Sequence, residues 1–305
     1  MEAPERPTLR SSRVRHWLGH LFREWTIESW RPIFPASAKP EPEKWSDAQV
    51  TLAWLGHATV LINFFGIKIL TDPVLFPRVG IRLPGFTIGP KRLTAPALEV
   101  HELPKIDLIL LSHAHFDHFD LRTLRCFDEN TSVITARATG DLLRRTRFRD
   151  ITELGWRKRK SFKTTTVGEI NVSAFPVNHW GARKQRDTYR GYNGYLLERK
   201  GRRIIFSGDT AMTDSFAELR RRGGIDLAIM PIGAYNPWIG SHCTPEQAVE
   251  MANASGARFI MPVHHRTFRL SFEPLREPIE RFEAALKQTP ERIALREIGE
   301  TFVLP

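Results

Sequence analysis

Short apolar runs separated by turn residues dominate the chain from Val50 onward. The runs at 50–54, 59–64 and 67–71 have strand length and contain many β-branched residues, and Phe65-Gly66 supplies a turn between the last two. We therefore predict a meander of three strands in this region. Apolar residues at helical spacing predict helices further along, at 121–127, 141–147, 214–222, 245–254 and 278–288. Strands and helices that alternate in this way are typical of an α/β protein.

The helix predicted at 245–254 has a clear start signal. Thr244 is a good N-cap, Pro245 suits the first helical position, and Gln247 can complete a capping box. We therefore expect this helix to begin at Pro245.

The pattern divides the chain into an N-terminal extension, residues 1–47, and a main domain, residues 48–305. In the extension, apolar residues at helical spacing predict an amphipathic helix, and several prolines predict a linker. The helix residues are Val14, Trp17, Leu18, Leu21, Phe22 and Trp25, and the prolines are Pro32, Pro35, Pro40 and Pro42. Such a helix packs on its own domain or lies on a membrane surface, and we favour packing because it is the commoner case.

Composition narrows the class of protein only slightly. A chain of 305 residues with 41% hydrophobic content can bury a large core. Cys126 and Cys243 are its only cysteines, so we predict no disulfide framework. No apolar run reaches the roughly 18 residues of a membrane span, and the first residues lack the apolar segment of a secretory signal. These features predict a cytoplasmic protein.

The net charge indicates a surface that attracts anions. It is +11, and basic residues cluster at 144–145, 157–160, 183–190 and 220–222. Phosphate-bearing lipid surfaces and nucleic acids both fit this charge, and so does an ordinary solvated surface.

The segment LSHAHFDHFD places four metal-binding side chains directly after a buried strand. The apolar run 106–111 predicts the strand, and His113, His115, Asp117 and His118 follow it. Alternate side chains of an extended segment share a face, so the first two histidines can bind one ion together. Asp117 and His118 lie past the turn and can bind a second ion. Imidazole and carboxylate ligands suit zinc.

Residues of the same types stand where other apolar runs end. They are His179 after 170–177, Asp209 after 203–208, and His264 and His265 after 258–263. Each alone is more simply interpreted as a hydrogen-bonded loop residue. Together with the first cluster, they predict a site for two metal ions.

The order H-x-H-x-D-H, then His, then Asp within S-G-D-T, then His, resembles that of the metallo-β-lactamase-fold hydrolases. Five further segments are similar to the N-acylphosphatidylethanolamine phospholipase D branch of that family, namely 52–62, 70–74, 89–92, 231–235 and 242–249. The resemblance covers most of the chain from Val50 onward. It implies an αββα sandwich of two mixed sheets with helices outside.

The resemblance also implies two zinc ions, although other divalent metals would fit. By match to the family's motifs, His113, His115 and His179 would hold the first ion, and Asp117, His118 and His264 the second, with Asp209 bridging. Asp117 would also orient the attacking water, and Asp209 would screen the two ions from each other. His242 matches a position near the family's site, so we expect it to contact the substrate.

The chain departs from the family where the last histidine stands. The family usually has His-Trp-Gly-Thr-Phe, and this chain has His-His-Arg-Thr-Phe at residues 264–268. Thr267 and Phe268 set the register, which makes His264 the matching ligand. His265 should then point to the opposite face if the strand continues.

The function that the resemblance implies is that of a dinuclear zinc phosphodiesterase of the phospholipase D type. Its substrate would be N-acyl phosphatidylethanolamine or a related glycerophospholipid. A lactonase or other carbonyl hydrolase of the same fold is the alternative. A nuclease is less favoured, because such nucleases usually carry an extra domain or arm, and only 30 residues separate His179 from Asp209. The full ligand set argues against a non-catalytic binding protein.

A lipid substrate would also predict peripheral contact with the inner face of a membrane. The basic surface and the long loop at 74–97 fit this idea, since the loop carries Leu75, Phe76, Leu83, Phe86 and Ile88. These side chains either line an acyl-chain groove or cover the edge of the sandwich. Nucleic acid is not an expected partner, and the sequence leaves the oligomeric state open.

Overall fold

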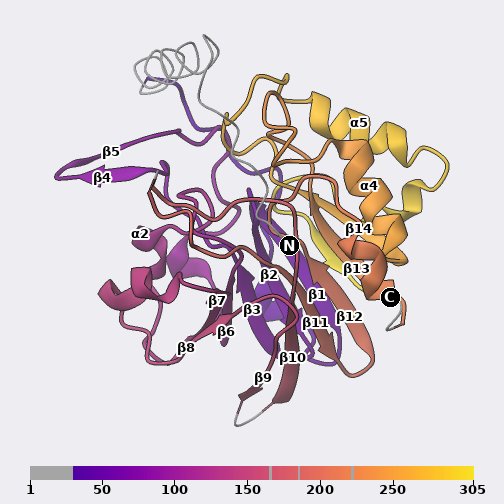
Figure 1. Cartoon of the computed structure of the whole chain (residues 1–305), viewed down its shortest axis with the longest axis horizontal. Helices are drawn as coiled ribbons and strands as arrows, with labels where there is room; N and C mark the ends of the chain where they lie inside the picture. Colours follow the sequence, from indigo (N-terminus) through magenta and orange to yellow (C-terminus); the bar gives the residue numbers. More distant parts are fainter. Residues whose placement is uncertain (1–29, 165–166, 185, 221–222) are drawn as a thin grey trace.

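The computed structural model describes residues 30–164, 167–184, 186–220 and 223–305 (Figure 1). The amphipathic helix predicted between Val14 and Trp25 lies outside these residues. Within the described ranges, no helix has both the length and the apolar character needed to cross a membrane.

Two sheets stacked face to face form the centre of the molecule (Figure 1). The first has the strand order β15-β1-β2-β3-β6-β7-β8 and the second β14-β13-β12-β11-β10-β9. The first contains β1 (Val50–Gly56), β2 (Thr59–Phe64), β3 (Ile67–Thr71), β6 (Leu108–Leu111), β7 (Ser132–Ala136), β8 (Ile151–Leu154) and β15 (Thr301–Val303). The second contains β9 (Arg159–Thr164), β10 (Gly168–Phe175), β11 (Gly194–Arg199), β12 (Arg202–Phe206), β13 (Ile225–Pro231) and β14 (Ala257–Val263). Both sheets combine parallel and antiparallel pairs, which confirms the predicted sandwich of mixed sheets.

The predicted meander is confirmed in β1, β2 and β3, which pair antiparallel in sequence order. Phe65 and Gly66 both have positive φ, at 52° and 93°, and so form the tight turn expected between β2 and β3. The side chain of Asn63 supports this turn by accepting a hydrogen bond of 2.8 Å from the Gly66 N–H.

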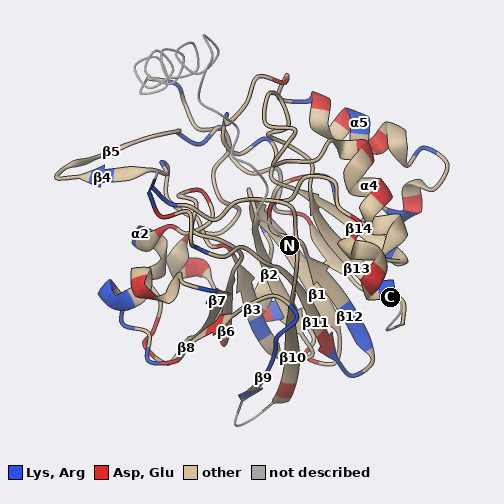
Figure 2. Ribbon diagram, viewed as in Figure 1, with Lys and Arg blue, Asp and Glu red and all other residues tan. Residues whose placement is uncertain are grey.

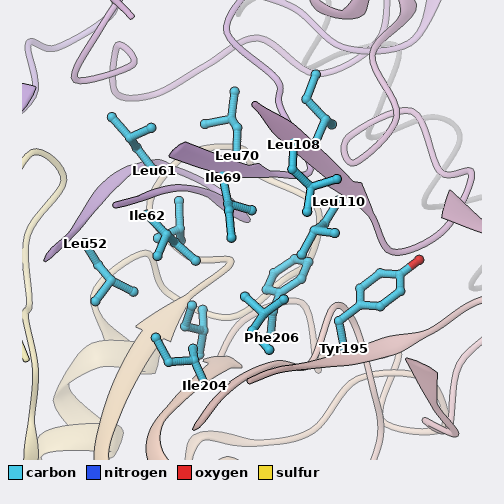
Figure 3. Close-up of a cluster of buried hydrophobic side chains, with 14 of the residues drawn as sticks. Leu52, Leu61, Ile62, Ile69, Leu70, Leu108, Leu110, Tyr195, Ile204 and Phe206 are labelled. Atoms are coloured by element: carbon cyan, nitrogen blue, oxygen red, sulfur yellow. The ribbon is translucent and has the colours of Figure 1, made fainter. Parts of the chain in front are cut away.

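Aliphatic and aromatic side chains from both sheets meet in the central core (Figure 3). Leu52, Ile62, Ile69, Leu108 and Leu110 from the first sheet lie in one buried cluster with Tyr195, Ile204 and Phe206 from the second. Each fully buried side chain of this size contributes roughly 1.5–3 kcal/mol to folding. The core therefore holds the two sheets together and fixes where their strand ends lie.

Helices cover the outside of the sandwich. Alternate residues of β13 face opposite ways, with Leu227 and Ile229 in the central core and Ala228 and Met230 in a second cluster. The helices α3 (Ser215–Arg220), α4 (Pro245–Ala254) and α5 (Glu277–Ala285) contribute to that second cluster. Beside the first sheet lies α2 (Leu121–Leu124) (Figure 1). The described residues also form the 3₁₀ helices η1 (Pro42–Lys44), η2 (Val100–Glu102), η3 (Gly140–Arg145) and η4 (Pro290–Arg292).

The predicted helices exist, with some differences in length and type. The helix at 245–254 has the predicted bounds, and the helix predicted at 121–127 ends at Leu124. The segment predicted as a helix at 141–147 is the 3₁₀ helix η3. Its backbone bonds join residues three apart, such as Thr146 N–H to the Leu143 carbonyl at 2.8 Å.

The capping box before α4 is present as predicted. The Thr244 Oγ1 accepts from the Gln247 N–H at 3.3 Å, and the Gln247 Oε1 accepts from the Thr244 N–H at 3.0 Å. Replacing Thr244 with Ala removes the first of these bonds, so Thr244→Ala should lower the free energy of unfolding by about 1 kcal/mol. Urea denaturation measures this change. Thr244→Ser, which keeps the hydroxyl, is the matched control and should retain most of the stability.

The second half of the predicted N-terminal extension lies along the sandwich. Phe34 N–H donates to the Leu93 carbonyl at 2.9 Å, and Ala95 N–H donates to the Phe34 carbonyl at 2.8 Å. Ser37 N–H also bonds to the Ile298 carbonyl at 3.0 Å. This part of the extension is therefore hydrogen-bonded to the domain that follows it.

The long loop predicted at 74–97 contains a hairpin of two short strands. These are β4 (Ile81–Leu83) and β5 (Phe86–Ile88), which pair with each other and with no other described strand. The hairpin projects from the body of the molecule (Figure 1). The sequence predicted an irregular loop here. The structure instead has two strands, because residues 81–83 pair with residues 86–88 across the turn at Pro84-Gly85.

Candidate metal centre

The strand ends bring the candidate ligands to one edge of the sandwich. Asp72 follows β3 directly, and the segment 113–118 begins two residues after β6 ends. From the second sheet, His179 follows β10, Asp209 follows β12 and His264 follows β14 directly. The central core sets the positions of all five strands, so residues far apart in sequence meet at this edge.

Three histidines form the first cluster. His113 Nε2 lies 2.8 Å from His115 Nδ1, and His179 Nε2 lies 3.2 Å from the same atom. Three nitrogens bound to one zinc ion at about 2.0–2.1 Å in tetrahedral geometry would lie about 3.3 Å apart. The three imidazoles therefore have an arrangement that can hold one ion.

The second cluster joins Asp117, His118 and His264. His118 Nε2 and His264 Nε2 are 3.1 Å apart, and the Asp117 Oδ2 lies 3.5 Å from the first and 3.6 Å from the second. These three atoms can also surround one ion. The candidate ligands thus lie in the two groups that the family resemblance implied.

Asp209 lies between the two clusters. Its Oδ2 atom is 3.0 Å from His118 Nε2 and 3.2 Å from His264 Nε2. The same atom is 3.9 Å from His179 Nε2 and 4.0 Å from His113 Nε2. One carboxylate oxygen therefore faces nitrogens of both groups, as a bridging ligand would.

Hydrogen bonds on the outer side of the rings determine which nitrogen faces the centre. The Ser112 hydroxyl donates to Asp72 at 2.5 Å, so it can only accept from His113 Nδ1, which lies 2.8 Å away. His118 Nδ1 lies 2.7 Å from the Asp72 Oδ2, and His179 Nδ1 lies 2.8 Å from the Ser241 carbonyl, which can only accept. In the neutral rings, each Nε2 then directs a lone pair at the centre.

These lone pairs converge with buried carboxylates, and this arrangement suits a cation. Burial would raise the pKa of Asp209, but His118 and His264 hold it well below its usual range. Burial disfavours a charged His118, but Asp209 and Asp117 still raise its pKa well above the usual value. The Asp209 Oδ1 atom is buried and has no hydrogen-bond partner among the described residues. The donor set therefore fits divalent metal ions of the zinc type.

Two further residues belong to the site, although we did not predict a role for either from the sequence. Asp72 accepts from Ser112 and His118, as described above. His57 Nε2 lies 2.9 Å from the Asp117 Oδ2. Burial, and next His264, lower the pKa of His57 to about 3, so its ring is neutral and Nε2–H can donate to that carboxylate. Both residues lie in segments of the family resemblance, and Asp72 also stands directly after a strand.

His242 lies beside the same centre. Its Nδ1 is buried without a hydrogen-bond partner in the described part of the chain, and it lies 3.8 Å from the Asp209 Oδ2. Its ring is 5.1 Å from the ring of His179 and 5.5 Å from that of His264. The position suits the substrate contact that we expected.

His264 and His265 have different surroundings. β14 ends at Val263, and His264 has a φ of 64°, so the extended backbone does not continue. His265 packs against Trp54, with ring centroids 4.6 Å apart. Neither ring nitrogen of His265 has a hydrogen-bond partner among the described residues, and burial lowers its pKa well below the usual value. His265 thus lies away from the metal-ligand groups.

Comparisons with known proteins agree with the fold and the site. Residues 68–265 match the model of the beta-lactamase superfamily domain, so the chain belongs to this superfamily. The structure of a novel metallo hydrolase from Ignicoccus hospitalis superposes with a TM-score of 0.62 at 19% identity, covering 84% of this chain and 99% of the other. That likeness supports the fold.

Relatives at about one-third identity indicate the branch within the superfamily. An uncharacterized protein of Mycobacterium tuberculosis is 32% identical over 87% of this chain and 71% of its own length. The N-acyl-phosphatidylethanolamine-hydrolyzing phospholipase D 1 of Caenorhabditis elegans is 32% identical over 73% of this chain and 65% of its own length. The mitochondrial enzyme of the same name from Saccharomyces cerevisiae is 34% identical over 80% and 53%. The predicted resemblance to this branch is confirmed, and the protein is a metal-dependent hydrolase of the metallo-β-lactamase fold.

Proposed function

We propose that the protein is a dinuclear zinc phosphodiesterase of the phospholipase D type. Its substrate would be N-acyl phosphatidylethanolamine or a related glycerophospholipid, which water would split into phosphatidic acid and an N-acylethanolamine. The observation that carries the proposal is the position of Asp209 Oδ2 within 4.0 Å of nitrogens from both clusters. The names of the nematode and yeast relatives support the choice of substrate.

The two clusters divide the proposed ligands between two metal ions. His113, His115 and His179 would hold one ion, Asp117, His118 and His264 the other, and Asp209 would contact both. When bound, two such ions supply a water of lowered pKa and stabilise the negative charge that develops on phosphorus oxygens.

The surrounding residues position these groups and the substrate. His57 donates to the Asp117 Oδ2 and so fixes the carboxylate that we propose orients the attacking water. Asp72 holds His118 in the tautomer that leaves Nε2 free. The His242 Nδ1 has no hydrogen-bond partner among the described residues, and we propose that it donates a hydrogen bond to a phosphoryl oxygen of the substrate.

A substrate comparison tests the proposal. Zinc-supplemented protein should release phosphatidic acid from N-acyl phosphatidylethanolamine in mixed micelles, and a chelator should abolish the reaction. Product analysis by mass spectrometry and the kcat/KM for this lipid, phosphatidylcholine and a panel of lactones give the ranking. Asp117→Asn is the control for contaminating activity, because it keeps the shape of the side chain but removes a ligand charge. A lactone with a kcat/KM above that of every phosphodiester would replace the proposal with the lactonase alternative.

A further inference from the structure

The hairpin β4–β5 exposes an apolar face. In its register, Ile81 lies opposite Ile88 and Leu83 opposite Phe86. Alternate strand residues share a face, so these four side chains lie together while Arg82 and Thr87 face the other way. Their exposed fractions are 57% for Ile81, 38% for Leu83, 51% for Phe86 and 45% for Ile88. A two-stranded hairpin with such a face is unusual on a protein surface that contacts only water.

The charges around the hairpin favour an anionic partner. Arg82 is exposed on β4, and Arg78 and Lys91 are half-buried at the base of the hairpin. Arg92 is buried and donates to backbone carbonyls, and the segment from Pro73 to Leu98 contains no Asp or Glu. Figure 2 shows the hairpin without acidic residues and with basic colour on β4, where Arg82 is exposed. An apolar face with basic neighbours matches the interface of an anionic bilayer, where apolar side chains meet the acyl region and cations meet phosphate groups.

The base of the hairpin has a fixed geometry. Gly80 and Gly89 approach each other so closely that a Cβ on either would lie 2.1 Å from a backbone carbonyl oxygen. Val79 N–H donates to the Pro90 carbonyl at 3.2 Å, and Arg92 N–H donates to the Pro77 carbonyl at 2.8 Å. These backbone contacts at its base therefore fix the direction in which the hairpin projects.

The same base is connected to the metal centre. Leu93 N–H donates to the Thr267 carbonyl at 2.8 Å, and Arg92 forms an isolated bridge with Phe268. The Phe268 ring lies 5.1 Å from the ring of His57, which contacts Asp117. A surface that binds the hairpin would therefore lie near the edge of the sandwich where the metal ligands meet.

An exposed aromatic residue lies beside the centre as well. Trp180 is half-exposed, and its ring is 4.5 Å from the ring of His115. Its amphipathic ring is of the kind that is favoured at a bilayer interface, and it stands beside the proposed metal ligands.

We infer that the β4–β5 hairpin inserts its apolar face into the surface of an anionic lipid bilayer and positions the site against the headgroups. The inference rests on the proposed function in naming a lipid as the substrate. Bilayer binding can nevertheless be measured without turnover. The proposed occupant of the apolar face is the bilayer. A second copy of the chain, or another segment of the same chain, on this face would contradict the inference.

Co-sedimentation of the full chain with vesicles tests the inference. With phosphatidylcholine and phosphatidylglycerol at about 3:1, binding should be tight at about 50 mM NaCl and weaker at about 500 mM, since salt screens the basic residues. The double variant Leu83→Ser/Phe86→Ser should bind at least about 10-fold more weakly, because it removes one cross-strand apolar pair. Thr87→Ser, on the opposite face of the hairpin, is the matched control and should bind like the unaltered chain.

Other measurements separate this inference from its rivals and from the proposed function. Both variants should keep their thermal stability, their oligomeric state and their hydrolysis of a small soluble phosphodiester. Unchanged vesicle binding in the double variant would overturn the inference. A dissociated dimer, or a large loss of thermal stability, would overturn it too, because the face would then be covered by protein. Hairpin-dependent binding by a chain that cleaves no phosphodiester would retain the inference and overturn the proposed function.

Discussion

Asp209→Ala is expected to lower kcat/KM by at least about 100-fold and to remove at least one metal ion per chain. Loss of a residue that only orients a ligand typically costs 10–100-fold, and Asp209 directly faces both clusters. Its removal would also leave His118 and His264 opposite each other, 3.1 Å apart, without the carboxylate between them. Elemental analysis gives the metal content, and steady-state kinetics gives the activity.

Two controls make the Asp209 result specific. Asp209→Asn keeps the size of the side chain but loses its charge, so it should also lose metal and activity if charge is what the site requires. Asp214→Ala removes an exposed carboxylate five residues away and should leave both quantities unchanged. Full activity and full metal content in Asp209→Ala would contradict a shared bridging ligand.

His264→Ala should also lower kcat/KM by at least about 100-fold, whereas His265→Ala should lower it far less. The reason is the difference in surroundings. The His264 Nε2 faces His118 and Asp209, but the His265 ring packs against Trp54. Kinetics and zinc content of the two variants, prepared in parallel, give the ranking.

The His265 variant needs a control for packing. Because the ring is buried against an indole, truncation to Ala leaves a cavity and lowers stability by about 2–4 kcal/mol, in the range of other large-to-small core changes. His265→Phe keeps an aromatic ring there and should recover most of that stability and full metal content. If His265→Ala lost metal while His264→Ala kept it, the assignment of the ligand would be reversed.

The acidic residues of the site should depend on one another. Asp72, Asp117 and Asp209 are three acidic side chains in one small volume, and their interactions converge on His118. Removing one member leaves the others buried without their partners, which costs more than the lost contact itself. We therefore expect substitutions in this group to have effects that do not add.

The sequence by itself determined the elements whose causes are local. Short apolar runs and the Phe65-Gly66 turn were enough to predict β1 to β3, and the Thr244 and Gln247 pair was enough to place the start of α4. The candidate ligands could also be selected from the sequence, because they lie in segments that follow apolar strands. At a strand end the backbone leaves the core, so polar side chains can follow the apolar run. This change from apolar to polar residues can be seen in a single sequence.

Only the tertiary structure decided how these strand ends meet. His57 and Asp117 are 60 residues apart, and Asp72 and His118 are 46 apart, so neither contact has a local signal. Packing between the sheets brings Asp209, in the segment after β12, opposite His118, in the segment after β6. The left-handed backbone at His264 separates it from His265. The exposed face of the β4–β5 hairpin likewise depends on register and on what lies over it. Sequence patterns determine which residues end a strand, but the partners of those residues depend on long-range packing.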